Sequence, residues 1–122
     1  MKGYMNVILI ILIGILFASL GQVFLKIGMN AVGSINTFTY SDIVSIFSNL
    51  YIILGLLMYG LGTIFWLIAL SQKDLSYVYP FIALTFIIVL FLSYFVLKEQ
   101  VSTIRVVGTI IIVIGLMIIV RG

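Results

Sequence analysis

The stretch that decides the fold is FASLGQVFLKIG, residues 17–28. All of it except Gly28 lies within an apolar run over residues 6–27, and about 20 apolar residues are enough to cross a membrane. Ser19, Gln22 and Lys26 recur within this run at intervals of three and four residues, so they share one helical face. A charge within hydrocarbon costs roughly 3 kcal/mol on insertion scales. The pattern therefore predicts a membrane helix with a polar, functional face.

The overall composition also places the chain in a bilayer. Of its 122 residues, 65% are hydrophobic and 7% are charged, and the mean hydropathy is +1.45. A chain of this size cannot hide so much apolar surface inside a soluble globule. We expect an all-α membrane protein with one domain over residues 1–122, a bundle of four transmembrane helices. The expected spans are residues 6–27, 50–71, 75–97 and 104–120.

Catalysis is not expected from this sequence. It contains no Cys and no His, which excludes thiolate metal sites and removes the usual proton shuttle and the commonest metal ligand. The spans also leave no soluble domain to hold a nucleophile–base pair or a phosphate-cradling glycine loop. The net charge of +3 reflects few acids rather than a basic face for nucleic acid. We therefore expect no enzyme, no cofactor, no metal site and no nucleic-acid partner.

A longer connection, residues 29–49, joins the first two expected spans. Its first half is rich in Gly, Asn, Ser and Thr, which is typical of a loop. Its second half, SDIVSIFSN over residues 41–49, would form a short helix capped by Ser41 or Asp42. We favour a prolonged first turn of the second span, and the alternative is an interfacial helix with its apolar side on the membrane surface.

Glycines recur seven residues apart in three of the expected spans. Seven residues are nearly two helical turns, so each set lies along one face where two backbones can approach closely. This spacing predicts helix packing and leaves open whether the neighbouring helix belongs to the same subunit. Four helices also make a thin bundle, so we expect at least a dimer. The three sets are Gly14, Gly21 and Gly28; Gly55 and Gly62; and Gly108, Gly115 and Gly122.

The cations leave the orientation in the membrane open. Four spans place three cations on each side, so the positive-inside rule gives no decision. Either Lys26 lies too deep to count, which weakly favours cytoplasmic termini, or the chain inserts in both orientations and forms an antiparallel dimer. The two sets are Lys2, Lys73 and Arg121, and Lys26, Lys98 and Arg105.

The third expected span opens with SYVYPFIALTF, residues 76–86. Pro80 removes a backbone donor and predicts a kink that frees a carbonyl group. Tyr77 and Tyr79 are candidate substrate contacts, or alternatively members of an ordinary aromatic belt at the membrane interface. Glu99, one of three acids in the chain, closes this span beside several cations with which it would pair.

A set of motifs runs through the chain outside residues 29–49. A Trp precedes a Tyr-Pro pair, a Glu followed by Val-Ser closes the third span, an Arg and a Gly open the fourth, and Gly-Gln precedes a Lys in the first. These residues are Trp66 and Tyr79-Pro80, Glu99 with Val101-Ser102, Arg105 with Gly108, and Gly21-Gln22 with Lys26. Their joint spacing resembles the EamA-type and small multidrug resistance branches of the drug/metabolite transporter superfamily, and more specifically the small subunits of the aminoarabinose-phosphoundecaprenol flippase.

The resemblance implies a bundle like that of the small multidrug resistance proteins, working as a dimer in the cytoplasmic (inner) membrane by alternating access. Gly108 and Gly115 match the glycine heptad through which those proteins dimerise. Those exporters also carry an essential Glu in the first span, and Ala18 takes its place here. Proton antiport against a cation needs a buried titratable group, and this chain has no acid at that depth.

An anionic substrate suits the polar face of the first span better. Gln22 offers two donors, Ser19 offers one, and Lys26 adds a positive charge, a set that fits a phosphate group. Arg105 lies on the same membrane side, where Glu99 would hold the cations in place. Each residue also has a purely structural interpretation, because the cations can anchor at the interface and the other two can bond a neighbouring helix.

Three functional hypotheses follow. The leading one is a flippase subunit that translocates a polyprenyl-phosphate-linked sugar or similar anionic membrane lipid, as a homodimer or a heterodimer with a paralogue. The second is a small multidrug resistance-like exporter of small solutes or cations, which would stack on aromatic rings. The third is a non-transporting assembly subunit of a membrane glycosyltransferase. We expect Lys26→Ala to abolish translocation in the first case, to alter specificity modestly in the second, and to leave the third unharmed.

The hypotheses assign roles to ten residues. The candidate substrate-binding residues are Ser19, Gln22, Lys26, Trp66, Tyr77, Tyr79, Glu99 and Arg105, and the candidate dimer-packing residues are Gly108 and Gly115.

Overall fold

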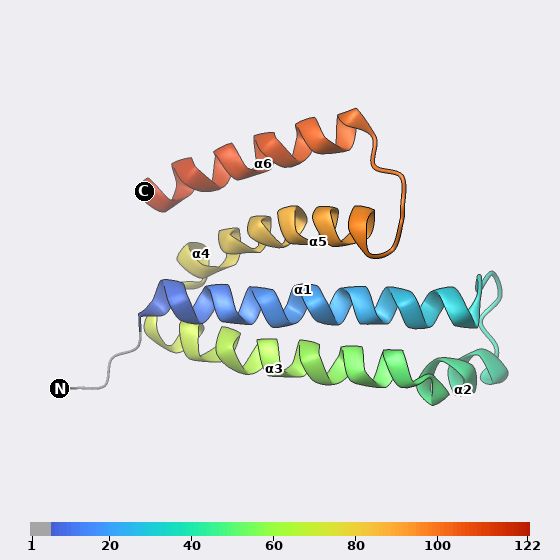
Figure 1. Cartoon of the computed structure of the whole chain (residues 1–122). Coiled ribbons are helices and arrows are strands. Elements are labelled where there is room, and N and C mark those ends of the chain that lie inside the picture. The colour runs from blue at the N-terminus through green and yellow to red at the C-terminus, as the bar shows by residue number, and fades with distance from the viewer. Residues whose placement is uncertain (1–5) are drawn as a thin grey trace.

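The computed structural model describes residues 6–122, and all regular structure in this range is helical (Figure 1). Lys2, counted above for orientation, lies outside the described residues. Four helical segments are long and apolar enough to cross a membrane, which confirms the expected all-helical fold with four potential spans. The elements are α1 (Val7–Val32), α2 (Tyr40–Ser48), α3 (Leu50–Gln72), α4 (Leu75–Val78), the 3₁₀ turn η1 (Tyr79–Ile82), α5 (Ala83–Phe95) and α6 (Thr103–Arg121).

The long helices lie roughly side by side, with α1 between α3 and α5 and with α6 beyond α5 (Figure 1). α1 packs most extensively on α3, and it also packs on α5, whereas α6 contacts mainly α5 and η1. The start of α1, α4 and the end of α6 lie at one end of the molecule (Figure 1). The helix α2 and the linker between α5 and α6 lie at the other end.

The interface between α1 and α3 is built on their glycines. A Cβ atom on Gly21 would lie 2.8 Å from the carbonyl oxygen of Gly55, and one on Gly62 would lie 2.7 Å from the carbonyl oxygen of Gly14. Real Cβ contacts are not this short, so the backbones approach as only glycine allows. The glycine sets of the first two spans therefore pack against each other within one chain.

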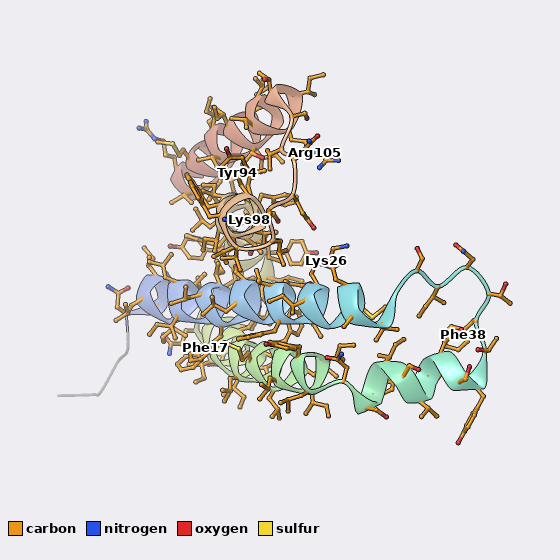
Figure 2. The ribbon with its side chains drawn as sticks, turned by 45° about the vertical axis from the view of Figure 1, so that its right-hand side comes forward. Phe17, Lys26, Phe38, Tyr94, Lys98 and Arg105 are labelled. Atoms are coloured by element: carbon orange, nitrogen blue, oxygen red, sulfur yellow. The ribbon has the colours of Figure 1, made fainter. Side chains whose placement is uncertain are left out.

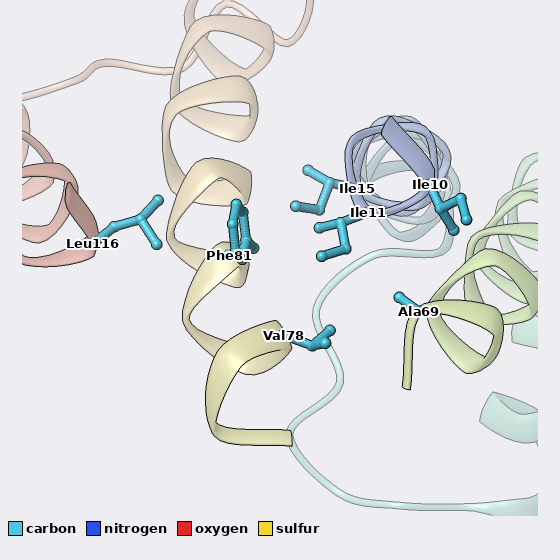
Figure 3. Close-up of a cluster of buried hydrophobic side chains, with 7 residues drawn as sticks. All are labelled: Ile10, Ile11, Ile15, Ala69, Val78, Phe81 and Leu116. Atoms are coloured by element: carbon cyan, nitrogen blue, oxygen red, sulfur yellow. The ribbon is translucent and has the colours of Figure 1, made fainter. Parts of the chain in front are cut away.

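The described core is small and centred on α1 (Figure 3). α6 contributes one buried residue, Leu116, whereas its Ile104 and Ile118 are 83% and 66% exposed. A Cβ atom on Gly108 or Gly115 would meet nothing within 4 Å. The helix α6 therefore leaves most of its apolar surface to lipid or to another subunit. The buried cluster comprises Ile10, Ile11, Ile15, Ala69, Val78, Phe81 and Leu116.

The structure of residues 29–49 differs from the favoured prediction. α2 is a separate helix and not a prolonged first turn of α3. Its N-cap is Thr39 rather than Ser41 or Asp42, and Asp42 completes a capping box. The Thr39 hydroxyl accepts from the Asp42 N–H at 3.3 Å, and the Asp42 carboxylate accepts from the Thr39 N–H at 3.2 Å. Asn49 is extended, with φ −82° and ψ 126°, and its side chain caps α3. The break arises because Asn49 bonds the first turn of α3 instead of continuing α2.

The third span is irregular at both ends. Around Pro80 the helix tightens into the 3₁₀ turn η1, which separates α4 from α5. α5 ends at Phe95, and Lys98 then adopts a left-handed conformation with φ 59°. The chain enters α6 at Ser102, whose hydroxyl accepts from the Arg105 N–H at 3.2 Å. These local features place the α5–α6 linker, and the charged residues in it, beside the start of α6.

Candidate functional site

A groove with polar residues in its walls runs between α1, α5 and α6 and has a volume of about 530 Å³. We name it the polar groove, and its polar residues come from four separate parts of the chain. Gln22 comes from α1, Glu99 from the α5–α6 linker and Arg105 from the first turn of α6. Thr85 and Ser93 add two hydroxyl groups from α5, and most of the remaining wall is apolar.

A second cavity, of about 400 Å³, lies between α1, α3 and the start of the third span. We name it the aromatic cavity, because Tyr59, Trp66 and Tyr79 line it. The rings of Trp66 and Tyr79 meet edge to face with their centroids 6.4 Å apart. Ala18 also lines this cavity, so the position aligned with the exporters' glutamate is apolar here.

The two cavities are adjacent and share part of their walls. Both are lined by Gln22, Ile82 and Thr85. Gln22 is therefore the polar side chain of α1 in the wall that the two cavities share.

Three cations lie at the same end of the molecule as Glu99. Lys26 follows Gln22 by one helical turn, and Figure 2 shows it extending from α1 on the side of α5 and α6. Figure 2 also shows Lys98 and Arg105 near the junction of α5 and α6. We name Lys26, Lys98, Arg105 and Glu99 the cationic mouth. Its net charge is positive, which favours an anion at this end of the molecule.

Hydrogen bonds fix the backbone at both charged residues of the polar groove. The Glu99 N–H donates to the carbonyl oxygen of Ser93 at 3.0 Å, after the left-handed turn at Lys98. That conformation costs a non-glycine residue about 1–2 kcal/mol. At Arg105, the Thr109 hydroxyl donates to the carbonyl oxygen at 2.8 Å, in addition to the bond from the N–H to Ser102. The two charges are thus presented from ordered backbone.

Three of the predicted substrate contacts line neither cavity. Lys26 lies at the mouth, outside both walls. Ser19 is fully buried, and among the described residues its hydroxyl has no hydrogen-bond partner. Tyr77 packs on Phe81 with ring centroids 5.6 Å apart and lies 5.3 Å from the ammonium nitrogen of Lys73. The structure brings the other candidates together in the two cavities, namely Gln22, Trp66, Tyr79, Glu99 and Arg105.

Sequence reasoning missed several wall residues. Thr85 and Ser93 lie on one face of α5 because they are eight residues apart, slightly more than two turns. The presence of these two hydroxyl groups inside an apolar run is the sequence feature that indicates a polar wall. Gly108 lines the polar groove, nothing described lies within 4 Å of its Cβ position, and its packing in a dimer stays a prediction. The lack of a side chain at Gly108 leaves space beside Arg105.

Comparison with known proteins identifies a transporter family and several relatives. The EamA-like transporter family matches residues 45–121. A probable 4-amino-4-deoxy-L-arabinose-phosphoundecaprenol flippase subunit ArnE from Pseudomonas aeruginosa (strain UCBPP-PA14) is 35% identical over 69 residues, 57% of this chain and 60% of that protein. The similarly named protein of Proteus mirabilis (strain HI4320) is 34% identical over 68 residues, 56% of this chain and 60% of that protein.

A more distant relative covers slightly more of the chain. The similarly named protein of Pseudomonas savastanoi pv. phaseolicola is 26% identical over 77 residues, 63% of this chain and 68% of that protein. The chain thus spans about 60% of the length of the Pseudomonas aeruginosa relative. No solved structure matches the chain.

Proposed function

The chain belongs to the EamA-like transporter family, and from this premise we propose that it is a flippase subunit that translocates a polyprenyl-phosphate-linked sugar or a similar anionic lipid. It would do so by alternating access in the cytoplasmic (inner) membrane. The relatives described above are themselves named as probable flippase subunits. The observation that carries the proposal is the polar groove, in which Gln22, Glu99 and Arg105 meet between largely apolar walls.

The polar groove has the chemistry to hold a phosphorylated sugar. The guanidinium of Arg105 can bond two phosphate oxygens at once, and the Gln22 amide offers two more donors. Thr85 and Ser93 can bond sugar hydroxyl groups, and Glu99 can accept from a hydroxyl or an amino group of the sugar. Because the surrounding walls are largely apolar, such bonds are stronger there than in water.

The size of the groove suits a headgroup rather than a whole lipid. Its volume of about 530 Å³ lies within the range of about 300–1,000 Å³ that is usual for ligand sites. A lipid-linked substrate keeps its tail in hydrocarbon throughout transport. The protein therefore has to shelter only the polar headgroup while it crosses.

The acids of the chain argue against proton-coupled export of cations. The chain has three acids. Asp42 lies in the capping box of α2, and Asp74 precedes α4, which leaves Glu99 as the acid in a cavity wall. Glu99 lies at the end of its span and not deep within it.

The aromatic cavity with Trp66 favours the alternative function, an exporter of small aromatic or cationic solutes that stack on its rings.

We also propose that the working unit has two subunits, either two copies or this chain with a paralogue. The exposed apolar surface of α6 supports this proposal. α6 forms one wall of the polar groove, and most of its apolar residues are exposed in the single chain. Alternating access needs two bodies that rock about a shared site. A second subunit against α6 would supply the second body.

Native mass spectrometry of the protein, extracted gently from its own membrane, tests the proposal. We expect a co-purifying polyprenyl phosphate sugar, with retention reduced at least about tenfold in Arg105→Gln, since hydrogen bonds to charged groups contribute about 1.5–3 kcal/mol each. Lys26→Gln, at the mouth, should reduce retention less. Arg121→Gln is the matched control, because Arg121 lies at the opposite end of α6.

Retention of bulk phospholipid alone, equal in the wild type and all three variants, would contradict the flippase proposal. In that case the exporter alternative predicts that an aromatic cation binds and that Trp66→Ala weakens its binding.

A further inference from the structure

A third cavity, of about 630 Å³, lies between α5 and α6. We name it the apolar groove, and its walls include Phe91, Tyr94 and Phe95 of α5 and Val106, Ile110 and Ile114 of α6. The polar groove uses other positions of the same two helices, Ser93 on α5 and Gly108 on α6 among them. Adjacent helical residues point about 100° apart. The two grooves therefore occupy different sides of the α5–α6 pair.

The walls of the apolar groove have almost nothing to offer a polar ligand. Among its lining side chains, Tyr94 and Thr109 carry the polar atoms. The Thr109 hydroxyl already donates to the carbonyl oxygen of Arg105 at 2.8 Å. The ligand chemistry that fits this groove is a hydrocarbon chain.

The apolar groove adjoins the polar groove along the contact between α5 and α6. Leu90 of α5, Val101 of the linker and Thr109 of α6 line both of them. Arg105, which lines the polar groove, directly precedes Val106, which lines the apolar groove. A molecule with a phosphate at Arg105 and a long apolar tail matches this pair of adjacent grooves in both chemistry and order.

We propose that the apolar groove binds the first part of the hydrocarbon tail of the lipid whose headgroup occupies the polar groove, an inference that rests on the proposed function. The tail passes between α5 and α6 at Leu90 and Thr109. Residues 106–114 of α6 line the groove over about 12 Å of helix, so the remainder of a polyprenyl tail extends into the bilayer. The weak burial of α6, which has one buried residue, Leu116, allows the two helices to separate around the tail.

Photolabelling in vesicles tests where the tail lies. The protein is reconstituted in phosphatidylcholine vesicles with a polyprenyl phosphate that carries a photoreactive group near the start of its tail. Phosphatidylcholine with the same photoreactive group is the control probe. We expect the polyprenyl phosphate to label Ile110 at least about fivefold more than Ile111, because Ile110 lines the apolar groove whereas Ile111 lines none of the three cavities. Identical labelling patterns from both probes would overturn the inference.

A pair of variants makes the test independent of one labelling position. Ile110→Trp should fill the apolar groove and reduce retention of the long polyprenyl phosphate at least about tenfold. Ile111→Trp, with the same change one residue away, should leave that retention unchanged. Retention of a short-chain isoprenyl phosphate should be unchanged in both variants, which shows that the polar groove is folded.

The outcomes separate this inference from the proposed function. If the wild type retains polyprenyl phosphate through Arg105 but Ile110→Trp and Ile111→Trp behave alike, the tail site is wrong and the flippase proposal stands. If Ile110→Trp separates the subunits and leaves lipid retention intact, the apolar groove is a subunit interface and the inference is overturned. If no phosphate probe is retained through Arg105, the proposed function itself fails.

Discussion

Gln22 and Ser19 show how differently two polar residues of one helical face can be used. Gln22 lines both the polar groove and the aromatic cavity, so its amide can contact a ligand in either one. Ser19 is buried, and within residues 6–122 its hydroxyl has no partner. An unsatisfied buried group costs about 1–3 kcal/mol.

The separation of these two residues could not be predicted from their spacing. Three residues place them about 60° apart around the helix, which is close enough to share one face. Which part of that face is covered depends on the neighbouring helices, and the periodicity of one helix does not specify them. Arg105 was more accessible to prediction, because a charge at the start of an apolar run is visible in the sequence alone.

The close approach of α1 and α3 predicts a strong effect of a single methyl group. Gly21→Ala places a Cβ atom 2.8 Å from the carbonyl oxygen of Gly55 and should lower the free energy of unfolding by about 1–3 kcal/mol through overpacking. Unfolding in mixed detergent micelles, followed by circular dichroism, measures this change. Gly60→Ala is the matched control on α3, because nothing lies within 4 Å of its Cβ position. Equal stability of the two variants would show that the glycine contact is not tight.

Among the helices, α2 is the element whose identity the sequence concealed. The residues on both sides of Asn49 are compatible with one continuous helix, which is why a prolonged first turn of α3 was favoured. The side chain of Asn49 interrupts that helix, because it accepts from the N–H groups of Tyr51 and Ile52 at 2.9 and 3.3 Å. A helix start that satisfies two orphan donors competes directly with continuation of the preceding helix.

The capping box makes the stability of α2 testable on its own. Thr39→Ala removes the hydroxyl that accepts from the Asp42 N–H and should destabilise the first turn by about 1 kcal/mol. Amide hydrogen exchange within residues 40–48 should then accelerate about fivefold, while exchange in α3 stays unchanged. Thr37→Ala, two residues earlier and outside the capping box, should leave exchange in α2 at the wild-type rate. Acceleration of similar size in both variants would refute a specific capping role.

At the scale of the whole molecule, the chain consists of a tightly packed pair and a loosely attached remainder. Glycine contacts join α1 and α3, whereas α6 buries little more than Leu116. The spans and their order were accessible from hydropathy alone, because apolar runs of this length have few alternatives. The unequal packing could not be predicted from the sequence, because the glycines have the same spacing in α6 as in α1. Only the three-dimensional arrangement distinguishes the two helices.

The proposed second subunit gives a prediction for α6. Gly115→Val should weaken subunit association at least about tenfold if the glycine face of α6 packs on a partner, and the fold of the single chain should tolerate it, because nothing lies within 4 Å of the Cβ position. Native mass spectrometry over a range of protein concentrations measures the change. Gly60→Val, also with open space at its Cβ position, serves as the control on α3. Unchanged association in both variants would place the subunit interface away from Gly115.

The unequal lengths of α1 and α6 have a consequence for the surrounding lipid. The 26 residues of α1 extend about 39 Å and the 19 residues of α6 about 28 Å, across a hydrocarbon core of about 30 Å. The excess length of α1 includes its last turns with Lys26 and Asn30, which can project from the hydrocarbon, and tilting relieves the remainder; the glycine contacts oblige α3 to tilt with α1. α6 fits the same thickness almost upright, and Figure 1 shows it inclined to α1, forming a wedge that is wider at the end of Arg105. Helix length thus bears on how each helix is inclined in the membrane.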